Sequence, residues 1–383
     1  MKRRFVDLLV EECRSSGSRF HLHRINPAGL FYPAGSPKLA AAATMAVDAP
    51  APATARLPRA AVSFKPCHEN SRESGQMVMM SLKNDVVVVN GRGGTVLYDG
   101  ASGALRTMQP APLHSPARSN FLVSVTVGDG LYVLSLGDGG YLTPYFQALV
   151  YGRQLGGHRR AEDWHWRPLQ SPTFDYCPDH DDRPSSSRGY YDDEWHHHVY
   201  APTGPQVAIG AYTVVGGSRI WVSATTGAGT HSYDTASGAW SKTGEWALPF
   251  KGRAQYVPEH GLWFGLSDKG GHLCVCAADL ATTTVPPALL HAWEDPPAPP
   301  EAWRTTAARL LPLGSGRLCV ARFFETSDEE NFAVLAGVEV VKDDDAGARN
   351  LRMIRHKSKR YNFGYDGVRF DRPEEEDGRT FYG

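Results

Sequence analysis

Short apolar runs separated by turn residues dominate the chain. Residues 86–89 are four consecutive valines, residues 131–136 read Leu-Tyr-Val-Leu-Ser-Leu, and similar runs recur as far as residue 356. Runs of this length, rich in β-branched and aromatic residues and bounded by Gly, Asp, Asn and Ser, are typical of strands rather than helices. The pattern therefore predicts an all-β protein of many short strands joined by tight turns.

One segment of this pattern occurs twice. Residues 95–104 read Thr-Val-Leu-Tyr-Asp-Gly-Ala-Ser-Gly-Ala, and residues 230–239 read Thr-His-Ser-Tyr-Asp-Thr-Ala-Ser-Gly-Ala. Asp99 and Asp234 stand 135 residues apart, three times 45, and Asp279 follows Asp234 at a distance of 45. A period near 45 is typical of four-stranded β-propeller blades, which bury their apolar faces only by packing around an axis.

From these anchors we assign the strands to six units, with five or seven blades as alternatives. The units cover residues 5–32, 77–108, 121–169, 207–243, 254–290 and 308–356. The first unit is incomplete, and we expect the extended stretch 360–370 to supply its missing strand. Pairing of N- and C-terminal strands would then close the ring and leave no long open edge. The prediction is a single kelch-like β-propeller domain over residues 1–370.

Three segments fall outside the repeats. Residues 36–61 are rich in Ala and Pro and are predicted to be a flexible insertion. Residues 172–205 are polar and are predicted to be a second one. Residues 371–383 are expected to form an acidic, disordered tail.

Composition argues against two classes of protein. The 383 residues carry 40 Lys and Arg against 41 Asp and Glu, a formal net charge of -1. This balance argues against a uniformly basic nucleic-acid-binding protein. The hydrophobic fraction of 42% is within the globular range and argues against a disordered chain.

Cysteine usage and the N-terminus bear on the compartment. The six cysteines follow no disulfide-scaffold spacing, so we expect free thiols and a reducing compartment. Cys274 and Cys276 lie in an apolar run and are predicted to be buried structural residues. The charged N-terminus does not match a signal peptide, and no apolar run is long enough to span a membrane. We expect a soluble protein of the cytoplasm or nucleus.

Candidate chemistry is sparse. Residues 196–198 are three histidines with acidic neighbours, but their spacing matches no metal motif, so we predict no metal site. The Gly-rich segments 91–94, 137–140 and 314–316 lack the Walker pattern and are predicted to be hairpin turns, without a cofactor. No G-x-S-x-G motif is present. We therefore predict no catalytic residue and no enzymatic activity.

A basic stretch and a group of tryptophans remain. Residues 352–360 are a weak candidate for contact with a partner or a nucleic acid, through Arg352, Arg355, Lys357, Lys359 and Arg360. An edge strand protected by its charges is the favoured interpretation. Four tryptophans are predicted to pack between blades rather than to form a ligand wall: Trp240, Trp246, Trp263 and Trp293.

Several longer motifs resemble one known family. They include Met-Lys-Arg-Arg-Phe-Val at residues 1–6, Trp-Ala-Leu-Pro-Phe-Lys-Gly-Arg-Ala at 246–254, Leu-Gly-Ser-Gly-Arg-Leu-Cys-Val at 313–320 and Leu-Arg-Met-Ile-Arg-His-Lys-Ser-Lys-Arg-Tyr at 351–361. They are similar to a large family of grass proteins classified as domain of unknown function 1668. The resemblance implies a plant source and a kelch-like propeller, and it supplies no catalytic residue.

We therefore expect a non-enzymatic, monomeric module that binds another protein through loops on one propeller face. The insertions would select the partner, whose identity the sequence does not give. One alternative is a propeller enzyme with a site at the central channel, although the predicted inner strands 121–127 and 207–215 are mostly apolar or small. The other is a nuclear protein that binds nucleic acid through residues 352–360.

Overall fold

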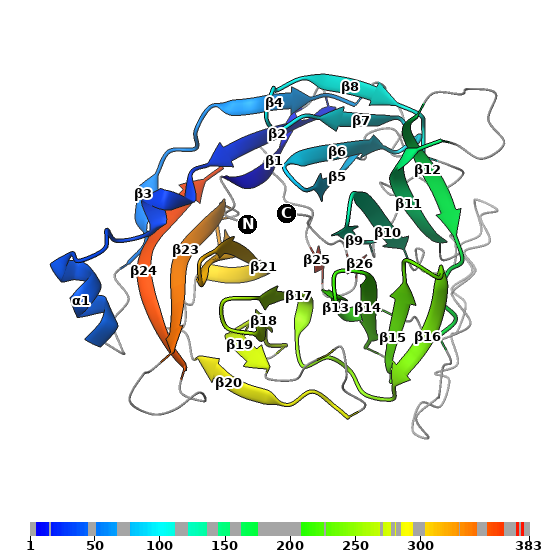
Figure 1. Ribbon diagram of the computed structural model, residues 1–383. Coiled ribbons are helices and arrows are strands. Elements are labelled where there is room, and N and C mark those ends of the chain that lie inside the picture. Colours follow the sequence, from blue (N-terminus) through cyan, green and yellow to red (C-terminus); the bar gives the residue numbers. More distant parts are fainter. Residues whose placement is uncertain are drawn as a thin grey trace, which may run out of the picture.

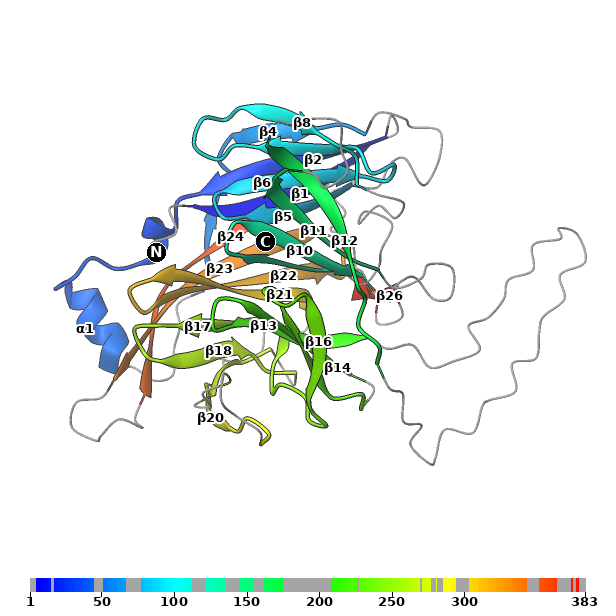
Figure 2. The same cartoon turned by 45° about the vertical axis from the view of Figure 1, so that its right-hand side comes forward.

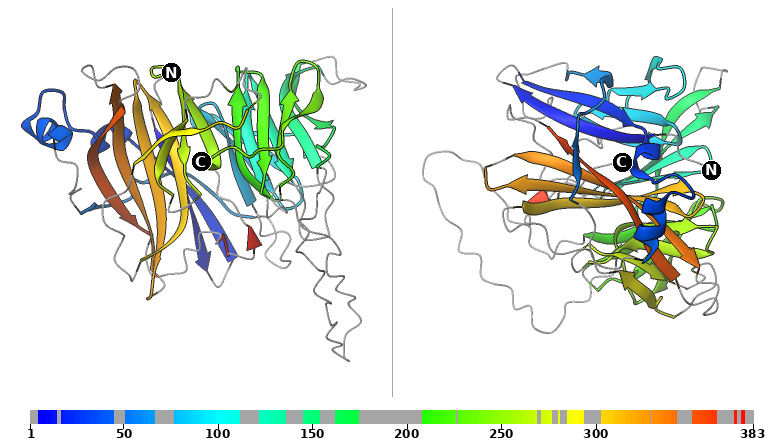
Figure 3. Two further views of the ribbon diagram at one scale, coloured as in Figure 1. Left: turned by 90° about the horizontal axis from the view of Figure 1, so that it is seen from below. Right: turned by 90° about the vertical axis from the view of Figure 1, so that its left-hand side faces the viewer.

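The computed structural model places strands around a common centre (Figure 1). It describes residues 5–14, 17–44, 51–66, 77–111, 122–135, 145–153, 162–174, 208–225, 227–268, 271–276, 280, 285–293, 303–328, 330–342, 351–363, 373–374 and 377–378. Seen from below, the strands run roughly along one axis, so that their ends gather on two opposite faces (Figure 3, left). The all-β prediction is confirmed.

The described strands around the centre fall into six consecutive groups. The first group contains β1 (Val6–Arg14), β2 (Gly17–Ile25) and β4 (Ala60–Phe64). The second contains β5 (Met77–Leu82), β6 (Asp85–Asn90), β7 (Thr95–Tyr98) and β8 (Leu105–Met108). The third contains β9 (Leu122–Val127), β10 (Gly130–Ser135), β11 (Tyr145–Gly152) and β12 (Asp163–Leu169).

The remaining groups have the same antiparallel order. The fourth contains β13 (Ile209–Val215), β14 (Arg219–Ala224), β15 (Thr230–Asp234) and β16 (Ala239–Gly244). The fifth contains β17 (Lys251–Val257), β18 (Leu262–Leu266), β19 (Leu273–Cys276) and β20 (Leu289–Trp293). The sixth contains β21 (Trp303–Gly314), β22 (Arg317–Thr326), β23 (Asn331–Lys342) and β24 (Leu351–Asn362). Parallel pairing of β13 with β17 joins the fourth and fifth groups into one eight-stranded sheet.

The hydrophobic core lies between the groups. Each of six buried clusters spans two neighbouring groups, in the order first–second, second–third, third–fourth, fourth–fifth, fifth–sixth and sixth–first. In the sixth–first cluster, Val6 and Leu8 of β1 pack with Leu311 of β21 and Phe332 of β23. Burial of apolar surface between neighbours is the main force that holds such sheets together.

The tryptophans predicted to pack between blades belong to these clusters. Trp263 and Trp293 are buried, and the Trp293 ring stacks against that of Phe264 at 6.4 Å. Trp240 and Trp246 are partly buried against the clusters of the fourth group. Their predicted core role is confirmed.

The first group lacks its innermost strand among the described residues. The register pairs Asp7 with Arg24 at the start of β1, and Arg24 contacts the β5–β6 turn at Asn84. Therefore β1 begins on the face where β5 ends, and it runs in the direction of β6. The three strands β1, β2 and β4 thus correspond to the second, third and fourth strands of the other groups. The stretch 360–370 was predicted to supply this strand. Its first residues, 360–362, instead form the end of β24, and residues 364–370 lie outside the described part.

Residues 36–61, predicted to be a flexible insertion, contain regular elements. Helix α1 (Pro37–Thr44) begins after Ser36, whose Oγ accepts the Leu39 N–H at 3.2 Å, because an Ala-rich stretch favours a helix. Strand β3 (Ala53–Ala55) pairs in parallel with residues 359–361 of β24 and adds a fifth strand to the sixth group. Helix α1 stands beside β24 outside the ring (Figures 1 and 2).

Three further expectations need correction or fall outside the described part. The end of the predicted strand unit 5–32 contains the 3-10 helix η1 (Pro27–Leu30), because Asn26 caps it and Pro27 favours a helical start. In the tail predicted to be disordered, β25 (Pro373–Glu374) pairs with β26 (Asp377–Gly378). The predicted insertion 172–205 lies outside the described part beyond residue 174.

The period of 45 was misapplied to the first pair of aspartates. Asp99 follows β7 in the second group, whereas Asp234 ends β15 in the fourth, so two groups separate them rather than three. The long connection 170–208 between β12 and β13 accounts for the extra residues. Asp279 lies outside the described residues.

Candidate functional site

The two faces of the ring carry different connections. Because neighbouring strands are antiparallel, the first-to-second and third-to-fourth turns of each complete group lie on one face, which we call the turn face. Its first-to-second turns are short, at residues 83–84, 128–129, 216–218, 258–261 and 315–316. The opposite loop face carries the second-to-third turns and the connections between groups. Its longest connection is 170–208, with 109–121 and 136–144 nearby in the chain.

Both ends of the connection 170–208 are attached to the loop face of the fourth group. The Phe174 ring meets the buried His231 ring edge-on at 4.9 Å. At the other end, the Ala208 carbonyl accepts hydrogen bonds from the backbone N–H of Thr225 at 2.8 Å and from its hydroxyl at 3.3 Å. The two anchors lie on either side of the β14–β15 turn at residues 225–229. They fix both ends of the connection on the fourth group.

A buried chain of hydrogen bonds holds the two strand ends that flank this turn. The Thr230 hydroxyl donates to the Trp246 carbonyl at 2.5 Å, so its single proton is used there. The Ser223 hydroxyl therefore donates to Thr230 Oγ1 at 2.8 Å, and Ser223 Oγ accepts the Leu248 N–H at 3.0 Å. Fully satisfied buried networks rigidify the elements that they join. This network ties the β14–β15 turn to the connection 245–250, which leads into the fifth group.

An equivalent threonine stands in the second group. Thr95 begins β7 as Thr230 begins β15, and both are buried. The Thr95 hydroxyl donates to the Gly93 carbonyl at 2.9 Å and accepts from Trp166 Nε1 of the third group at 3.1 Å. The aligned repeats at residues 95–104 and 230–239 both begin with this Thr, which is the signal by which the sequence could have identified the position.

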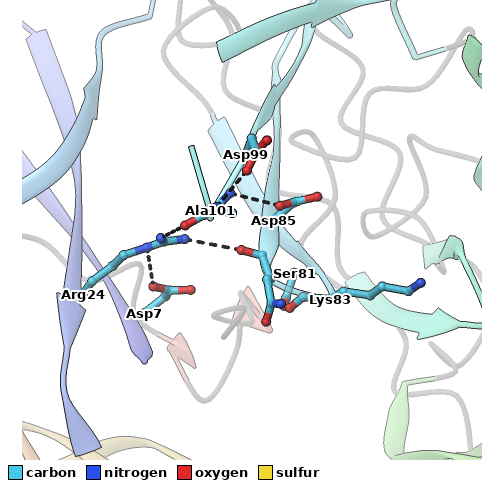
Figure 4. Close-up of polar contacts among 9 residues, drawn as sticks. Asp7, Arg24, Ser81, Lys83, Asp85, Asp99 and Ala101 are labelled. Atoms are coloured by element: carbon cyan, nitrogen blue, oxygen red, sulfur yellow. Dashed lines mark hydrogen bonds and ion pairs between the residues drawn. The ribbon is translucent and has the colours of Figure 1, made fainter. Parts of the chain in front are cut away.

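The turn face is held by polar contacts between neighbouring groups. Figure 4 shows Arg24 of β2 reaching toward the turns of the second group. Its Nε lies 3.2 Å from Asp7 Oδ1, and its guanidinium donates to the Gly100 and Asn84 carbonyls. Because these partners are backbone carbonyls and a neighbouring carboxylate, the arrangement joins the first group to the second rather than offering a free cation.

Other turn-face contacts are similar. Lys83 pairs with Asp129 between the second and third groups. Between the fifth and sixth groups, Glu259 Oε1 accepts the Ser315 N–H at 2.6 Å. The turn face is therefore locked by its own polar groups. The Gly-rich segments 91–94 and 314–316 are turns between strands, as predicted, and 137–140 lie outside the described part.

The predicted basic contact residues lie on β24, and three of them contact the protein itself. The Arg360 guanidinium lies 3.8 Å from the Phe332 ring centroid and 3.5 Å from Glu330 Oε2. Lys357 Nζ lies 5.2 Å from the Tyr32 ring, and Lys359 Nζ lies beside Gly29. Arg352 is exposed and Arg355 half-buried, and both also have interactions. Strand β3 covers the edge of β24 at residues 359–361.

His356 lies between two of these basic residues on the same strand. Its side chain is fully buried, Nδ1 accepts the Tyr32 N–H at 3.2 Å, and Nε2 lies 3.0 Å from Glu339 Oε2. The proton is therefore on Nε2, which donates to Glu339. Burial lowers the pKa of His356, opposed by Glu339. Both ring nitrogens are used in structural hydrogen bonds, so neither is available as a base.

The remaining candidates for chemistry divide between buried and undescribed residues. Cys274, Cys276 and Cys319 are buried free cysteines, as predicted for the first two, and burial raises the pKa of Cys274 to about 12. Residues 196–198 lie outside the described part. Within the described residues, no group of three metal-ligating side chains converges and no helix is long and apolar enough to cross a membrane.

The inner strands carry more charge than the sequence led us to expect. The predicted inner strands now identified as β9 and β13 are apolar or small, but Figure 1 also places β1, β17 and β21 near the centre. These strands contain Glu11, Arg253 and Arg309, each half-buried and each engaged in an interaction.

Comparisons with known proteins give a family and distant structural likenesses. A family model described as "Protein of unknown function (DUF1668)" matches residues 3–361. No curated protein matches the chain.

Among solved structures, the chain is similar to the β-propeller domain of Myceliophteria thermophila Cps50 (Swd1), with 11% identity over 73% of this chain and 86% of that one and a TM-score of 0.30. The SapL1 lectin in complex with alpha methyl fucoside gives 10% identity over 78% and 95%, with a TM-score of 0.32. The WD40 domain of SCAP from fission yeast gives 12% identity over 73% and 61%, with a TM-score of 0.27.

Proposed function

The chain belongs to the DUF1668 family, whose function is unknown, and from this premise we propose that it is a non-enzymatic protein-interaction module whose partner binds the loop face. The observation that carries the proposal is the double anchoring of the connection 170–208 on the fourth group, through Phe174 and Ala208. Loops carried on a rigid scaffold are where binding residues concentrate, which favours recognition on this face.

We further propose that the six groups are kelch-like blades of one closed propeller. The six clusters between neighbouring groups support this, including the one between the sixth and the first. Strand β24 ends on the loop face, where the first strand of every complete group begins. Residues 364–370 would then add the inner strand beside β1. Truncation after Phe363 should lower the melting temperature of the protein, and an unchanged melting temperature would reject this closure.

The assignment as a non-enzyme is supported by how the described ionisable residues are used. Both ring nitrogens of His356 are engaged, and Arg24 joins two groups. The thiol of Cys274 is buried and protonated at neutral pH. A catalytic acid, base or nucleophile needs an accessible atom and a matched pKa.

The same cysteines support a proposal for the compartment. We propose that the module works in a reducing compartment, the cytoplasm or the nucleus. The support is that the described cysteines are free thiols rather than disulfides.

The test replaces one connection on each face of the ring. In one variant, residues 175–207 are replaced by a Gly-Ser sequence of equal length. In the matched control, residues 154–161 of the turn-face connection between β11 and β12 are replaced in the same way. We expect a partner identified by quantitative affinity purification, and then purified, to lose affinity for the first variant only. Equal binding by wild type and the loop-face variant, with both proteins folded, would contradict the proposal.

A further inference from the structure

His260 lies at the turn-face end of the junction between the fifth and sixth groups. It belongs to the β17–β18 turn at residues 258–261, and its backbone N–H donates to the Val257 carbonyl at 3.0 Å. On one side, its ring lies 5.8 Å from the Phe264 ring of β18. On the other side, Nε2 lies against Gly316 of the β21–β22 turn, where a Cβ atom would come within 3.1 Å of it. The imidazole is therefore enclosed between two neighbouring groups.

The ring occupies this place without a polar partner. Both ring nitrogens of His260 are buried, and neither makes a hydrogen bond of normal geometry with a residue in the described part of the chain. The side chains of Phe264 and Val340 nearby belong to the buried apolar cluster of the fifth and sixth groups. A protonated imidazole carries two N–H donors and a positive charge, and burying an unpartnered charge costs far more than burying the neutral ring. The closed junction therefore favours neutral His260.

Two charged side chains act on the His260 ring from the elements packed against it. Glu259 lies on the same turn, is exposed, and already accepts a backbone N–H of the sixth group at 2.6 Å. Lys342, at the end of β23, is exposed and carries the same charge as a protonated imidazole. Strand β18 and the β21–β22 turn contain no charged residue, and Arg317, which follows that turn, pairs with Glu339 at 3.7 Å. A protonated ring would thus meet one carboxylate that is already engaged and one repelling ammonium group.

These surroundings set the direction in which pH acts on the junction. Burial, the largest cause, and the charge of Lys342 lower the pKa of His260, opposed by Glu259 and by the Val340 carbonyl. With a lowered folded pKa, the contribution of neutral His260 to the closed junction is complete above the ordinary histidine pKa of about 6.5 and is lost as pH falls through the folded pKa. Acid therefore favours a junction in which the ring has reached water.

We propose that His260 makes the junction between the fifth and sixth groups pH-sensitive: its protonation separates the β17–β18 and β21–β22 turns, and its deprotonation lets them close. The hydrogen bond from the Ser315 N–H to Glu259 crosses the same junction and opens with it. Local opening of this kind needs less free energy than global unfolding, because the clusters between the other groups stay intact. The movement is on the turn face, so it is independent of the proposed partner binding on the loop face.

The test measures hydrogen exchange of the full-length protein by mass spectrometry at pH 7.5 and pH 5.5, with each rate corrected for the intrinsic effect of pH. We expect peptides over residues 257–266 and 313–320 of wild type to exchange several-fold faster at pH 5.5, and at most about tenfold, because the opening follows protonation of one group. The variants His260→Phe and His260→Leu, which do not titrate at this position, should lose this response. His356→Gln is the matched control, because it removes another buried histidine of the sixth group, and it should keep the response.

Each other outcome overturns the proposal. Wild-type peptides that exchange equally at the two pH values show that the junction does not open. A full response in both His260 variants, or an equal loss of the response in His356→Gln, places the responsible proton elsewhere. Faster exchange spread evenly over all six groups shows global unfolding instead of opening at this junction.

Discussion

Asp99 and Asp234 perform the same task in two different groups. Asp99 Oδ1 accepts the Ala101 N–H at 2.7 Å, and Asp234 Oδ1 accepts the Ala236 N–H at 2.9 Å. Asn26 at the end of β2 does the same for Ala28 at 2.9 Å. A side chain that accepts the N–H two residues on stabilises the start of a turn. The repeated motif is therefore a repeated turn, and Asn26 extends it to the first group.

Removing the Asp99 carboxylate should destabilise this turn. Hydrogen bonds from the backbone N–H groups of Ser102 and Ala101 lower the pKa of Asp99. A group with a lowered folded pKa stabilises the fold above its unfolded pKa and loses that effect as pH falls through the folded pKa. We expect Asp99→Ala to lower the melting temperature at pH 7 and to match wild type more closely in acid. Thermal unfolding at several pH values measures this, with Asp129→Ala on the turn face as the control.

Removing Arg24 should weaken the junction of the first and second groups. The substitution Arg24→Met keeps much of the side-chain volume but leaves Asp7 without its ion pair and the Gly100 carbonyl without a donor. We expect a loss of about 2 kcal/mol in the free energy of unfolding, because the Arg24 and Asp7 side chains are only 15% and 29% exposed. Urea unfolding measures it. Lys83→Met, at the exposed pair with Asp129, should cost less than about 0.5 kcal/mol.

The Arg24 effect should depend on Asp7. In a double-mutant cycle with Asp7→Asn, the two losses should be less than additive. Full additivity would show that the ion pair contributes nothing.

His356 should make stability depend on pH. Because burial lowers its folded pKa, its contribution is complete above the ordinary histidine pKa of about 6.5 and is lost as pH falls through the folded pKa. Urea unfolding between pH 7.5 and pH 5 should show this decline in wild type. The variant His356→Gln, which does not titrate, should show a shallower decline. Equal slopes in the two proteins would exclude His356 as a source of the pH dependence.

The buried cysteines should be unreactive in the folded protein. Burial raises the pKa of Cys274 to about 12, so its reactive thiolate is scarce at pH 8. In a variant with serine at Cys13, Cys67 and Cys177, a thiol reagent should give no rapid reaction until denaturant is added. Fast labelling of the native variant would contradict the burial of Cys274, Cys276 and Cys319.

The sequence by itself determined the local structure. Alternating apolar residues and Asp-Gly or Ser-Gly turns depend on near neighbours, so most strands of the second, third, fourth and sixth groups lie where the pattern places them. The repeated Tyr-Asp turn was visible for the same reason. The burial of Cys274 and Cys276 followed from an apolar run.

Only the tertiary structure decided which segments lie together. The parallel pairing of β3 with β24 joins residues near 54 and 360, and no local pattern encodes a contact across that separation. The direction of β1, which leaves the first group without an inner strand among the described residues, is visible only from the contact between Arg24 and Asn84, 60 residues apart. The basic residues of β24 formed one stretch in the sequence, but their contacts with Phe332, Tyr32 and Gly29 come from elements that folding brings to them. Charge along a chain is a local property, whereas its availability to a partner is set by long-range packing.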